Sequence, residues 1–299
     1  MSFRSFRPMN PSGRRALSLD ELRAIAPSAF ASAAHESRST RYTYIPTVTV
    51  IEGMIRAGFQ PFNAMQGNSR VEGKAEFTKH LIRFRHPDAT AVNVGDTIPE
   101  VVLINSHDGT SSYKLIAGLF RLVCTNGLMV ADSTVESLTV PHKGDIVNKV
   151  IEGSFEIVGQ TRNALETVDV WRNLRLTDGE QRVFSEVAHD LRFGRNVTNE
   201  QTGETRRVVE TGITPAQLLN ARRSEDMRND LYSVFNRIQE NSIRGGIHPS
   251  HYQRNASGNR VRRVPTREVR GIDQNVNINR ALWALTERMA ELKGESRAA

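Results

Sequence analysis

The sequence predicts an α+β protein, in which an antiparallel, hairpin-rich sheet is followed by a helical C-terminal half. Two changes along the chain predict this class. Between residues 59 and 142, short β-branched and aliphatic runs are separated by tight-turn residues, whereas after Gly144 apolar residues recur at helical spacing. With 299 residues, of which 38% are hydrophobic, the chain can bury the core of one large or two ordinary domains.

Three regions follow from this pattern. They are a flexible N-terminal arm at 1–40, a mainly antiparallel β region with one early helix at 41–143, and a helical region at 144–299. In the arm, Ser18 precedes "LDELRAIA" and Glu21 follows three residues later, which is the spacing of a helix capping box. One short helix is therefore expected within the arm.

The β region is expected to open with a helix that Thr47 caps and Gly58 ends, followed by a strand. A further strand is expected from Phe77 in "FTKHLIRFRH", where charged and apolar side chains share both faces. Two clearer strands, 101–105 and 113–123, flank "HDGT", whose Asp-Gly pair is typical of a hairpin turn. Short strands after "TNG" and in "ESLTVPH" complete the expected sheet.

Five helices are expected in the helical region. The first covers "DIVNKVIEGSFEIVGQTRNALETVDVWRNLRL", and the second begins at Thr177 with Glu180 at capping-box spacing. The third opens with Pro215 after Thr214, since proline favours the first helical position. The fourth covers "DMRNDLYSVFNRIQENSI" with one apolar stripe that includes Met227, and the fifth covers "INRALWALTERMAELKG".

Most of the excess positive charge lies in the loop at 242–271. The formal net charge of the whole chain is +7, and this segment holds seven arginines, no lysine and one acid, Glu268. It lacks helical or strand periodicity, and loops longer than about 15 residues are usually functional or disordered. Arginine without lysine favours a clamp on nucleic acid or on an acidic protein, because the planar guanidinium binds phosphate through two hydrogen bonds and stacks on bases. A solvated linker is the alternative.

Cations on the expected sheet extend this candidate interface. Lys79, Arg83 and Arg85 alternate along one strand face, and a row of cations would follow a phosphate backbone. Aromatic side chains at Phe77, Phe84 and Tyr113 would add stacking faces, unless the arm or the helices cover the sheet. The predicted nucleic-acid-binding residues are Lys79, Arg83, Arg85, Lys114, Arg121, Arg244, Arg262, Arg263, Arg267 and Arg270.

Motifs of the common nucleotide-dependent enzymes do not occur in the sequence. It contains neither "GxxxxGK[ST]" nor "GxGxxG". The pairs His80/His86 and His248/His251 lack cysteine or carboxylate neighbours at zinc-ligand spacing. We therefore expect a protein that is not an enzyme and carries no metal or other cofactor.

A metal-dependent nuclease stays open as an alternative. Asp88, Asp96, Glu100 and Asp108 supply carboxylates near the expected sheet, although no regular spacing groups them. The single cysteine, Cys124, precedes a tight turn and is expected to pack in the interior, as free cysteines usually do. One cysteine cannot form an intramolecular disulfide, so a reducing, cytoplasmic location is expected.

No apolar run in the sequence approaches the roughly 20 residues needed to cross a bilayer. The N-terminal stretch "MSFRSFRPMNPSGRR" also lacks the apolar core of a secretory signal. We therefore expect no membrane association.

Several stretches resemble the phage- and plasmid-encoded family of domain of unknown function 932. They are "RYTYIPT", "GFQPF", "FTKHLIRFRH", "VVLINSHDGTSSYKLIAGLFRLVCTNGL", "DLYSVFNRIQENSIRGG" and "RVRRVPTREVRGIDQNVNINRALWALTERM". The resemblance runs from about residue 41 to residue 293 and implies a mobile-element context, without catalytic residues to carry over. It also divides the arginine-rich loop into patterned ends and a variable tip, "IHPSHYQRNASGN".

The expected function follows from charge and context together. Mobile elements commonly carry strand-annealing recombination proteins that combine a small antiparallel sheet with packed helices and assemble into rings or filaments. We therefore expect a non-enzymatic, homo-oligomeric binder of single-stranded nucleic acid, with DNA favoured over RNA. The alternative is an interaction protein that counters a host defence system through a host or phage protein partner. Strand preference and oligomeric state stay open.

Overall fold

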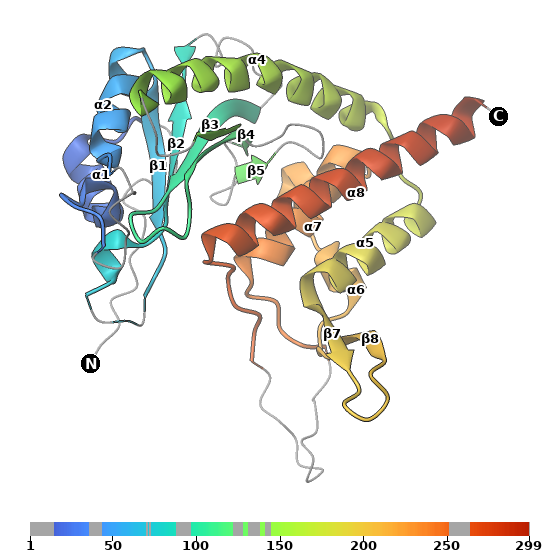
Figure 1. Ribbon diagram of the computed structural model, residues 1–299. Coiled ribbons are helices and arrows are strands. Elements are labelled where there is room, and N and C mark those ends of the chain that lie inside the picture. Colours follow the sequence, from blue (N-terminus) through green and yellow to red (C-terminus); the bar gives the residue numbers. More distant parts are fainter. Residues whose placement is uncertain are drawn as a thin grey trace. The chain divides into compact units, whose positions relative to one another are not determined.

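The computed structural model describes residues 15–35, 44–69, 71, 73–87, 97–121, 128–130, 138–140, 145–250 and 264–298. The chain divides into two compact units, coloured along the sequence in Figure 1. The sheet unit comprises Met1–Thr167 with Gly271–Asp273, and the helical unit comprises Val168–Arg270 with Gln274–Ala299. The division lies within α4 (Ile146–Asn173) and not at residue 144, because the first part of α4 packs into the core of the sheet unit.

The sheet unit is built on an antiparallel sheet, and the helical unit is mostly helical, which confirms the predicted α+β class. Neighbouring strands pair in the order β1-β2-β3-β4-β5, and β6 also pairs with β4. The strands are β1 (Gln60–Gln66), β2 (His80–Arg85), β3 (Thr97–Asn105), β4 (Tyr113–Arg121), β5 (Leu128–Val130) and β6 (Leu138–Val140). No helix within the described residues combines the length and the apolar content needed to cross a membrane.

The predicted hairpin around "HDGT" is confirmed between β3 and β4. Gly109 has a φ of 77°, a conformation that glycine adopts without steric cost. The carboxylate of Asp108 accepts hydrogen bonds from the backbone N–H and the hydroxyl of Thr110, at 3.0 and 2.6 Å. These contacts form a turn with its own side-chain cap, and the strands beside it pair from Thr97↔Arg121 to Ile104↔Lys114.

The N-terminal segment 15–35 packs into the core and is not a loose arm, contrary to expectation. The predicted capping box is confirmed at α1 (Leu19–Ile25), where Ser18 and Glu21 bond each other's backbone N–H groups. After α1 comes a 3₁₀ turn, Pro27–Phe30. Apolar side chains make this segment part of the core, with Leu17, Leu22, Ala26 and Ala29 all buried.

Helix α2 (Thr47–Arg56) begins one residue earlier than expected, since its N-cap is Pro46 and Thr47 is the first helical residue. The Thr47 hydroxyl is instead the centre of a buried polar cluster. It lies 3.0 Å from ring nitrogens of His80 and His107, and it accepts a hydrogen bond of 3.0 Å from Asn105. Burial and the charge of His107 lower the pKa of His80 to about 3, so this ring is neutral at physiological pH.

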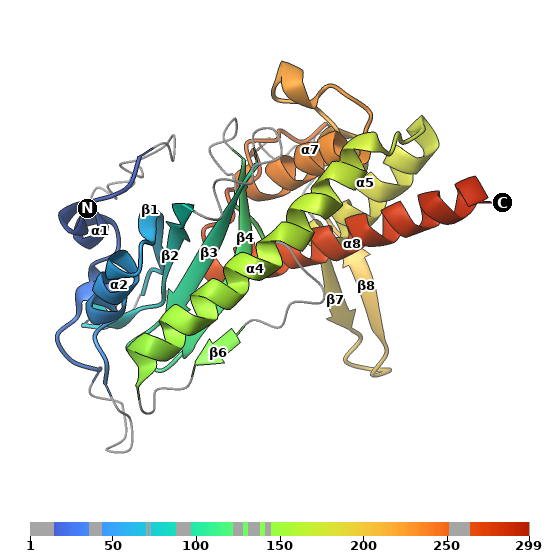
Figure 2. The same cartoon turned by 90° about the horizontal axis from the view of Figure 1, so that it is seen from above.

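Helix α4 is continuous through both of its internal glycines, and it runs alongside β3 and β4 in both ribbon views (Figures 1 and 2). A β-carbon at Gly153 would lie 2.0 Å from Leu138 Cδ2 and 2.9 Å from Leu115 Cδ1. The missing side chain therefore lets α4 approach β4 and β6 closely, which accounts for a residue that otherwise weakens a helix.

The helical unit contains α5 (Asp178–Phe193), α6 (Pro215–Leu218), α7 (Leu231–Arg244) and most of α8 (Ile272–Ala298). Three aromatic rings of its core, those of Trp171, Phe235 and Trp283, pack against one another. The centroid of Trp171 lies 4.5 Å from that of Trp283 and 5.7 Å from that of Phe235. The predicted capping box at the start of α5 is confirmed, with Thr177 and Glu180 in reciprocal hydrogen bonds.

Three features of the helical unit differ from the sequence prediction. A hairpin of β7 (Gly194–Thr198) and β8 (Thr205–Val209) was not predicted, although "NVTNEQTGETRRVV" carries a turn between two polar strands. Helix α6 is a single turn. Helix α7 begins only at Leu231, because Asp230 is its N-cap and its carboxylate accepts a hydrogen bond from Ser233 N at 2.9 Å. Met227 therefore lies outside the helix, and it is 70% exposed.

Candidate nucleic-acid interface

Helix α7 is buried on all sides although half of it is polar. Every residue from Leu231 to Ile243 is buried. A helix buried on every side is usually apolar throughout, so the polar side chains of α7 require partners inside the protein. They are Ser233, Asn236, Arg237, Gln239, Glu240, Asn241 and Ser242. The arrangement of these partners determines the chemistry of the C-terminal end of α7.

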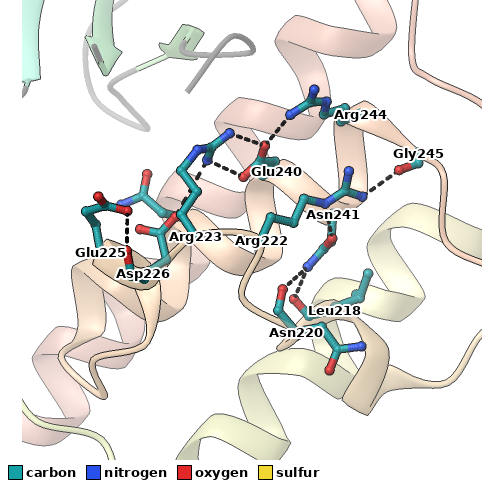
Figure 3. Close-up of polar contacts among 12 residues, drawn as sticks. Leu218, Asn220, Arg222, Arg223, Glu225, Asp226, Glu240, Asn241, Arg244 and Gly245 are labelled. Carbon is teal, nitrogen blue, oxygen red and sulfur yellow. Dashed lines mark hydrogen bonds and ion pairs between the residues drawn. The ribbon is translucent and has the colours of Figure 1, made fainter. Parts of the chain in front are cut away.

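Glu240 is the buried centre of an arginine cluster, shown in Figure 3. Its carboxylate accepts two hydrogen bonds from Arg223, at 2.6 and 2.7 Å, and one from Arg244, at 3.0 Å. The side chain of Glu240 is only 3% exposed, whereas that of Arg244 is 42% exposed. Asp226 adds a second carboxylate at 3.7 Å from Arg223. We call Arg222, Arg223, Arg244 and Glu240 the α7 arginine cluster.

Electrostatics keep this cluster ionised. Burial alone would raise the pKa of Glu240, but the hydrogen bonds from Arg223 and Arg244 and the charge of Arg222 outweigh it and hold the pKa below its usual range. Burial lowers the pKa of Arg222, and the charges of Arg244 and Arg223 oppose the favourable effect of Glu240 on it. Guanidinium groups stay protonated in proteins even so. Three positive charges therefore face the carboxylates of Glu240 and Asp226.

Two arginines cap the carbonyl end of α7. Arg222 donates from Nε to Asn241 Oδ1 at 2.7 Å and from Nη2 to the carbonyl of Gly245 at 2.5 Å. Arg192 donates from Nε to the carbonyl of Ser242 at 2.7 Å. Cations are favoured at a helix C-terminus, because the last carbonyls lack partners within the helix and carry partial negative charge. This end of α7 thus gathers arginines from α5 and from the segment before α7.

The two ends of the arginine-rich loop are joined by backbone hydrogen bonds. Gly246 N donates to Thr266 O at 2.7 Å, Thr266 N to Ile247 O at 2.9 Å, and Val269 N to Ile243 O at 2.8 Å. We call this paired region the loop stem. Gly245 is essential to its geometry, because its φ is 68° and a β-carbon there would lie 2.6 Å from Thr266 O.

Three of the predicted loop arginines lie at this stem. Arg244 is the last residue of α7, and Arg267 is exposed with no hydrogen bond from its guanidinium to any described residue. Arg270 is 72% exposed and pairs with Glu268 at 3.1 Å. Arg262 and Arg263 lie outside the described residues. The stem therefore brings together the two patterned ends of the loop.

The predicted cations on the sheet do not form an exposed row. Both faces of β2 are buried, so Arg83 and Arg85 lie inside the protein and pair with Glu100 at 2.5 and 2.8 Å. Buried guanidinium groups require such a partner, because an uncompensated charge in the interior is very unfavourable. Lys79 bonds both carboxylate oxygens of Asp273, at 2.6 and 2.8 Å, within the same unit.

The other predicted sheet residues add little to an interface. Lys114 is half-buried, and the side chain of Arg121 lies outside the described residues. Phe84 and Tyr113 have no exposed surface, so they cannot stack on bases. Phe77 packs against the ring of His35, with the ring centroids 5.3 Å apart. The candidate interface therefore lies on the helical unit.

The carboxylates of the nuclease alternative do not converge among the described residues. Both carboxylate oxygens of Glu100 bond arginines, and the carboxylate of Asp108 accepts a hydrogen bond from Thr110 within the β3–β4 turn. Asp88, Asp96 and Cys124 fall outside the described part of the chain. Within that part, no three side chains of histidine, cysteine, aspartate or glutamate gather as metal ligands would.

Arg192, Arg222, Arg223 and Glu240 were not predicted as site residues. Glu240 and Arg223 are 17 positions apart and belong to different elements, so only the packing of η3 (Ser224–Asp226) beside α7 brings them together. The one visible signal in the sequence is the pair "RR" directly before the acidic residues of "SED", one of which, Asp226, lies 3.7 Å from Arg223.

The comparisons with known proteins agree with the resemblance. The sequence profile of the family described as "Domain of unknown function (DUF932)" matches residues 34–283. The chain is 43% identical over 273 residues to "UPF0380 protein YafZ" and 42% identical to "UPF0380 protein YfjQ", both of Escherichia coli strain K12, with 91% of each chain covered. No solved structure matches the chain.

Proposed function

The chain belongs to the DUF932 family, and from the arginines that its helical unit presents we propose that it binds single-stranded nucleic acid, DNA in the first place, without being an enzyme. The observation that carries the proposal is the loop stem, which holds Arg244, Arg267 and Arg270 at one end of α7. Each guanidinium that contacts a phosphate adds free energy by counterion release, and this contribution does not depend on base sequence.

The rigidity of the stem supports this proposal. Three backbone hydrogen bonds and the positive φ of Gly245 fix the base of the loop. Arginines on a fixed scaffold lose less conformational entropy on binding than arginines on a free linker. A solvated linker would gain nothing from such a stem.

The type of cation supports it as well. Lys293 is the only lysine between Val168 and the C-terminal end of the sequence, so arginine supplies the remaining basic side chains of the helical unit. Lysine would serve solubility equally well. Arginine differs in its planar fork, which binds a phosphate through two hydrogen bonds and stacks on unpaired bases.

Self-association is part of the proposal, and a stripe on α5 supports it. Val183, Val187 and Leu191 recur at helical spacing and are 53%, 40% and 39% exposed. We propose that a second copy of the chain covers this stripe, as annealing proteins that form rings or filaments require. The biological setting we propose is phage or plasmid recombination in the bacterial cytoplasm.

The central experiment is a salt titration of the binding of a fluorescent oligothymidine, followed by anisotropy. We expect affinity to fall steeply with salt for the natural chain. The triple variant R244A/R267A/R270A should bind more weakly and lose roughly 2 units of the log–log salt slope, because up to three phosphate contacts disappear at about 0.7 each.

A triple variant of equal charge change provides the control. Arg175, Arg182 and Arg288 are exposed arginines of the same unit, away from the stem. Their replacement by alanine should leave most of the slope in place. Equal effects of the two triple variants would show non-specific attraction, and undetectable binding at low salt would refute the proposal. Matched RNA and duplex DNA probes give the strand preference.

The assembly is tested separately. Val187→Asp should reduce the mass measured by light scattering and abolish rings or filaments in micrographs, without changing contacts of the stem. If both the natural chain and Val187→Asp have the mass of a monomer, self-association is refuted. Retention of one host protein after nuclease treatment of a lysate would favour the defence-countering alternative.

A further inference from the structure

The α7 arginine cluster carries more positive than negative charge at a partly exposed position. Arg222, Arg223 and Arg244 face the carboxylates of Glu240 and Asp226, so the three guanidinium groups outnumber these two carboxylates. Uncompensated charge of one sign beside a protein interior attracts a counterion, because the surrounding dielectric screens it less than water does. The unbalanced charge is the first observation that points to an anion.

Donors on two of these arginines are also unused. Arg222 directs Nε and Nη2 at Asn241 and Gly245, which leaves Nη1 without a partner among the described residues. Arg244 bonds Glu240 through Nη1 alone, so its Nε and Nη2 have no partner in the described part of the chain. Both residues are exposed, so these donors are open to a ligand.

The two guanidinium groups are held at the same turn. Arg222 bonds the carbonyl of Gly245, the residue that follows Arg244, and the charge of Arg244 acts on Arg222. Figure 3 shows both side chains anchored at this end of α7 from different elements. Glu240 thus serves as a positioning residue, because it orients Arg244 while leaving the outer donors of Arg244 unoccupied.

We propose that Arg222 and Arg244 form a binding site for a single phosphate group. A tetrahedral phosphate presents several oxygens to two guanidinium groups at once, and paired arginines are the usual ligands of such an anion. The inference rests on the proposed function only for the molecule that carries the phosphate. That molecule would be a nucleic-acid strand, and the phosphate would be its 5′-terminal phosphate or an internal phosphodiester.

The first test measures thermal unfolding of the full chain in inorganic phosphate against chloride at equal ionic strength. Phosphate should raise the Tm of the natural chain by about 2–4 °C. The shift should disappear in R244A and in R222K, whose lysine keeps the charge but not the planar fork. R182A, an exposed arginine outside the cluster, should retain it.

The second test compares 5′-phosphorylated and 5′-hydroxyl oligonucleotides in the same salt. A terminal phosphate predicts roughly tenfold tighter binding of the phosphorylated strand, lost in R244A. Equal binding that inorganic phosphate competes away would support the internal phosphodiester. If oligonucleotides bind but inorganic phosphate neither stabilises nor competes, the phosphate site is refuted and the proposed function stands. If phosphate stabilises the natural chain but not R244A and no oligonucleotide binds, the site stands and the proposed function fails.

Discussion

The two units each contain a glutamate held by two arginines, and the two clusters differ in exposure. In the sheet unit, Arg83 and Arg85 bond Glu100, with side chains that are 6%, 6% and 0% exposed. In the helical unit, Arg223 and Arg244 bond Glu240, and their side chains are 18% and 42% exposed. The same combination of two arginines and one glutamate is therefore a buried structural cluster in one unit and an accessible cluster in the other.

The difference shows that charge composition alone does not identify a binding surface. In the closed cluster the guanidinium groups of Arg83 and Arg85 are buried, so they present no donors to a ligand at the surface. An open cluster keeps donors at the surface, and Arg222 adds a further charge to it. Accessibility, and not the number of arginines, separates the structural cluster from the candidate site.

The largest expected effect is the loss of Glu100. Glu100→Gln should reduce the free energy of unfolding by about 3–5 kcal/mol, because it removes the charged carboxylate that two buried guanidinium groups bond. Glu240→Gln should cost less, roughly 1–3 kcal/mol, because Arg244 is free to turn toward solvent. Urea unfolding followed by circular dichroism measures both. Equal losses would mean that the α7 arginine cluster is as closed as the sheet cluster.

The chain offers a probe that distinguishes the units in this experiment. Its two tryptophans, Trp171 and Trp283, both lie in the helical unit. Tryptophan fluorescence should therefore follow Glu240→Gln directly, whereas Glu100→Gln should alter circular dichroism first. A change in both signals at the same urea concentration for both variants would show that the units unfold as one.

Acid should destabilise the sheet unit through His80. Its pKa is about 3 in the folded chain and near 6.5 as the ordinary value, so the unfolded chain binds the proton more readily between these pH values. Stability is then complete above pH 6.5 and falls as the pH drops toward 3, by about 3 kcal/mol at pH 4.5. His80→Gln should flatten this dependence, measured by urea unfolding at several pH values. An unchanged slope in the variant would assign the acid sensitivity to other groups.

A smaller effect is expected from a single methyl group in the loop stem. Gly245→Ala should cost about 1–3 kcal/mol, since φ 68° and ψ −156° form a backbone conformation that essentially only glycine adopts and the methyl group meets Thr266 O at 2.6 Å. Oligonucleotide binding should weaken with it, although no charge changes. Gly246→Ala is the matched control: its φ is 79°, but nothing lies within 4 Å of the added carbon, so only the backbone cost of roughly 1 kcal/mol applies. Equal binding by both variants would show that the stem does not position the arginines.

The smallest effect on stability is expected for Arg270→Ala. Its pair with Glu268 is exposed on both sides, and such surface pairs contribute between 0 and about 1 kcal/mol. Binding should respond more than stability, with a loss of roughly 0.7 in the salt slope. A stability loss as large as that of Glu100→Gln would show that Arg270 stabilises the fold and does not serve only in binding.

Several local patterns were predicted correctly, although the Asp230 cap of α7 and the β7–β8 hairpin, which are equally local, were not. The capping boxes at Ser18 and Thr177 and the turn at Gly109 depend on contacts within a few residues, and all three are confirmed. Predictions failed where burial was involved. The composition of segment 15–35 is typical of a loop, and the sequence therefore predicted an exposed arm. The few apolar residues of the segment nevertheless anchor it in the core.

The candidate site shows the same limit. Arg244, Arg267 and Arg270 are apparent from charge density, because a run of arginine without lysine is visible in the sequence itself. Arg222 and Glu240 are not, because their roles depend on contacts 17 or more positions apart. Arg83 and Arg85 were predicted as surface cations. Strand alternation shows which side chains lie on the same face of a sheet, but it does not show whether other parts of the protein cover that face.

The sequence by itself determined the α+β class, the order of the main helices and strands, the capping boxes at Ser18 and Thr177, the turn at Gly109, and the position of the excess charge. Each of these depends on interactions between residues near one another in the chain. Tertiary structure alone decided which arginines are buried and which stay accessible. That choice depends on packing between distant segments, where removing a charge from water is tolerated only when a carboxylate such as Glu100 lies within hydrogen-bond distance.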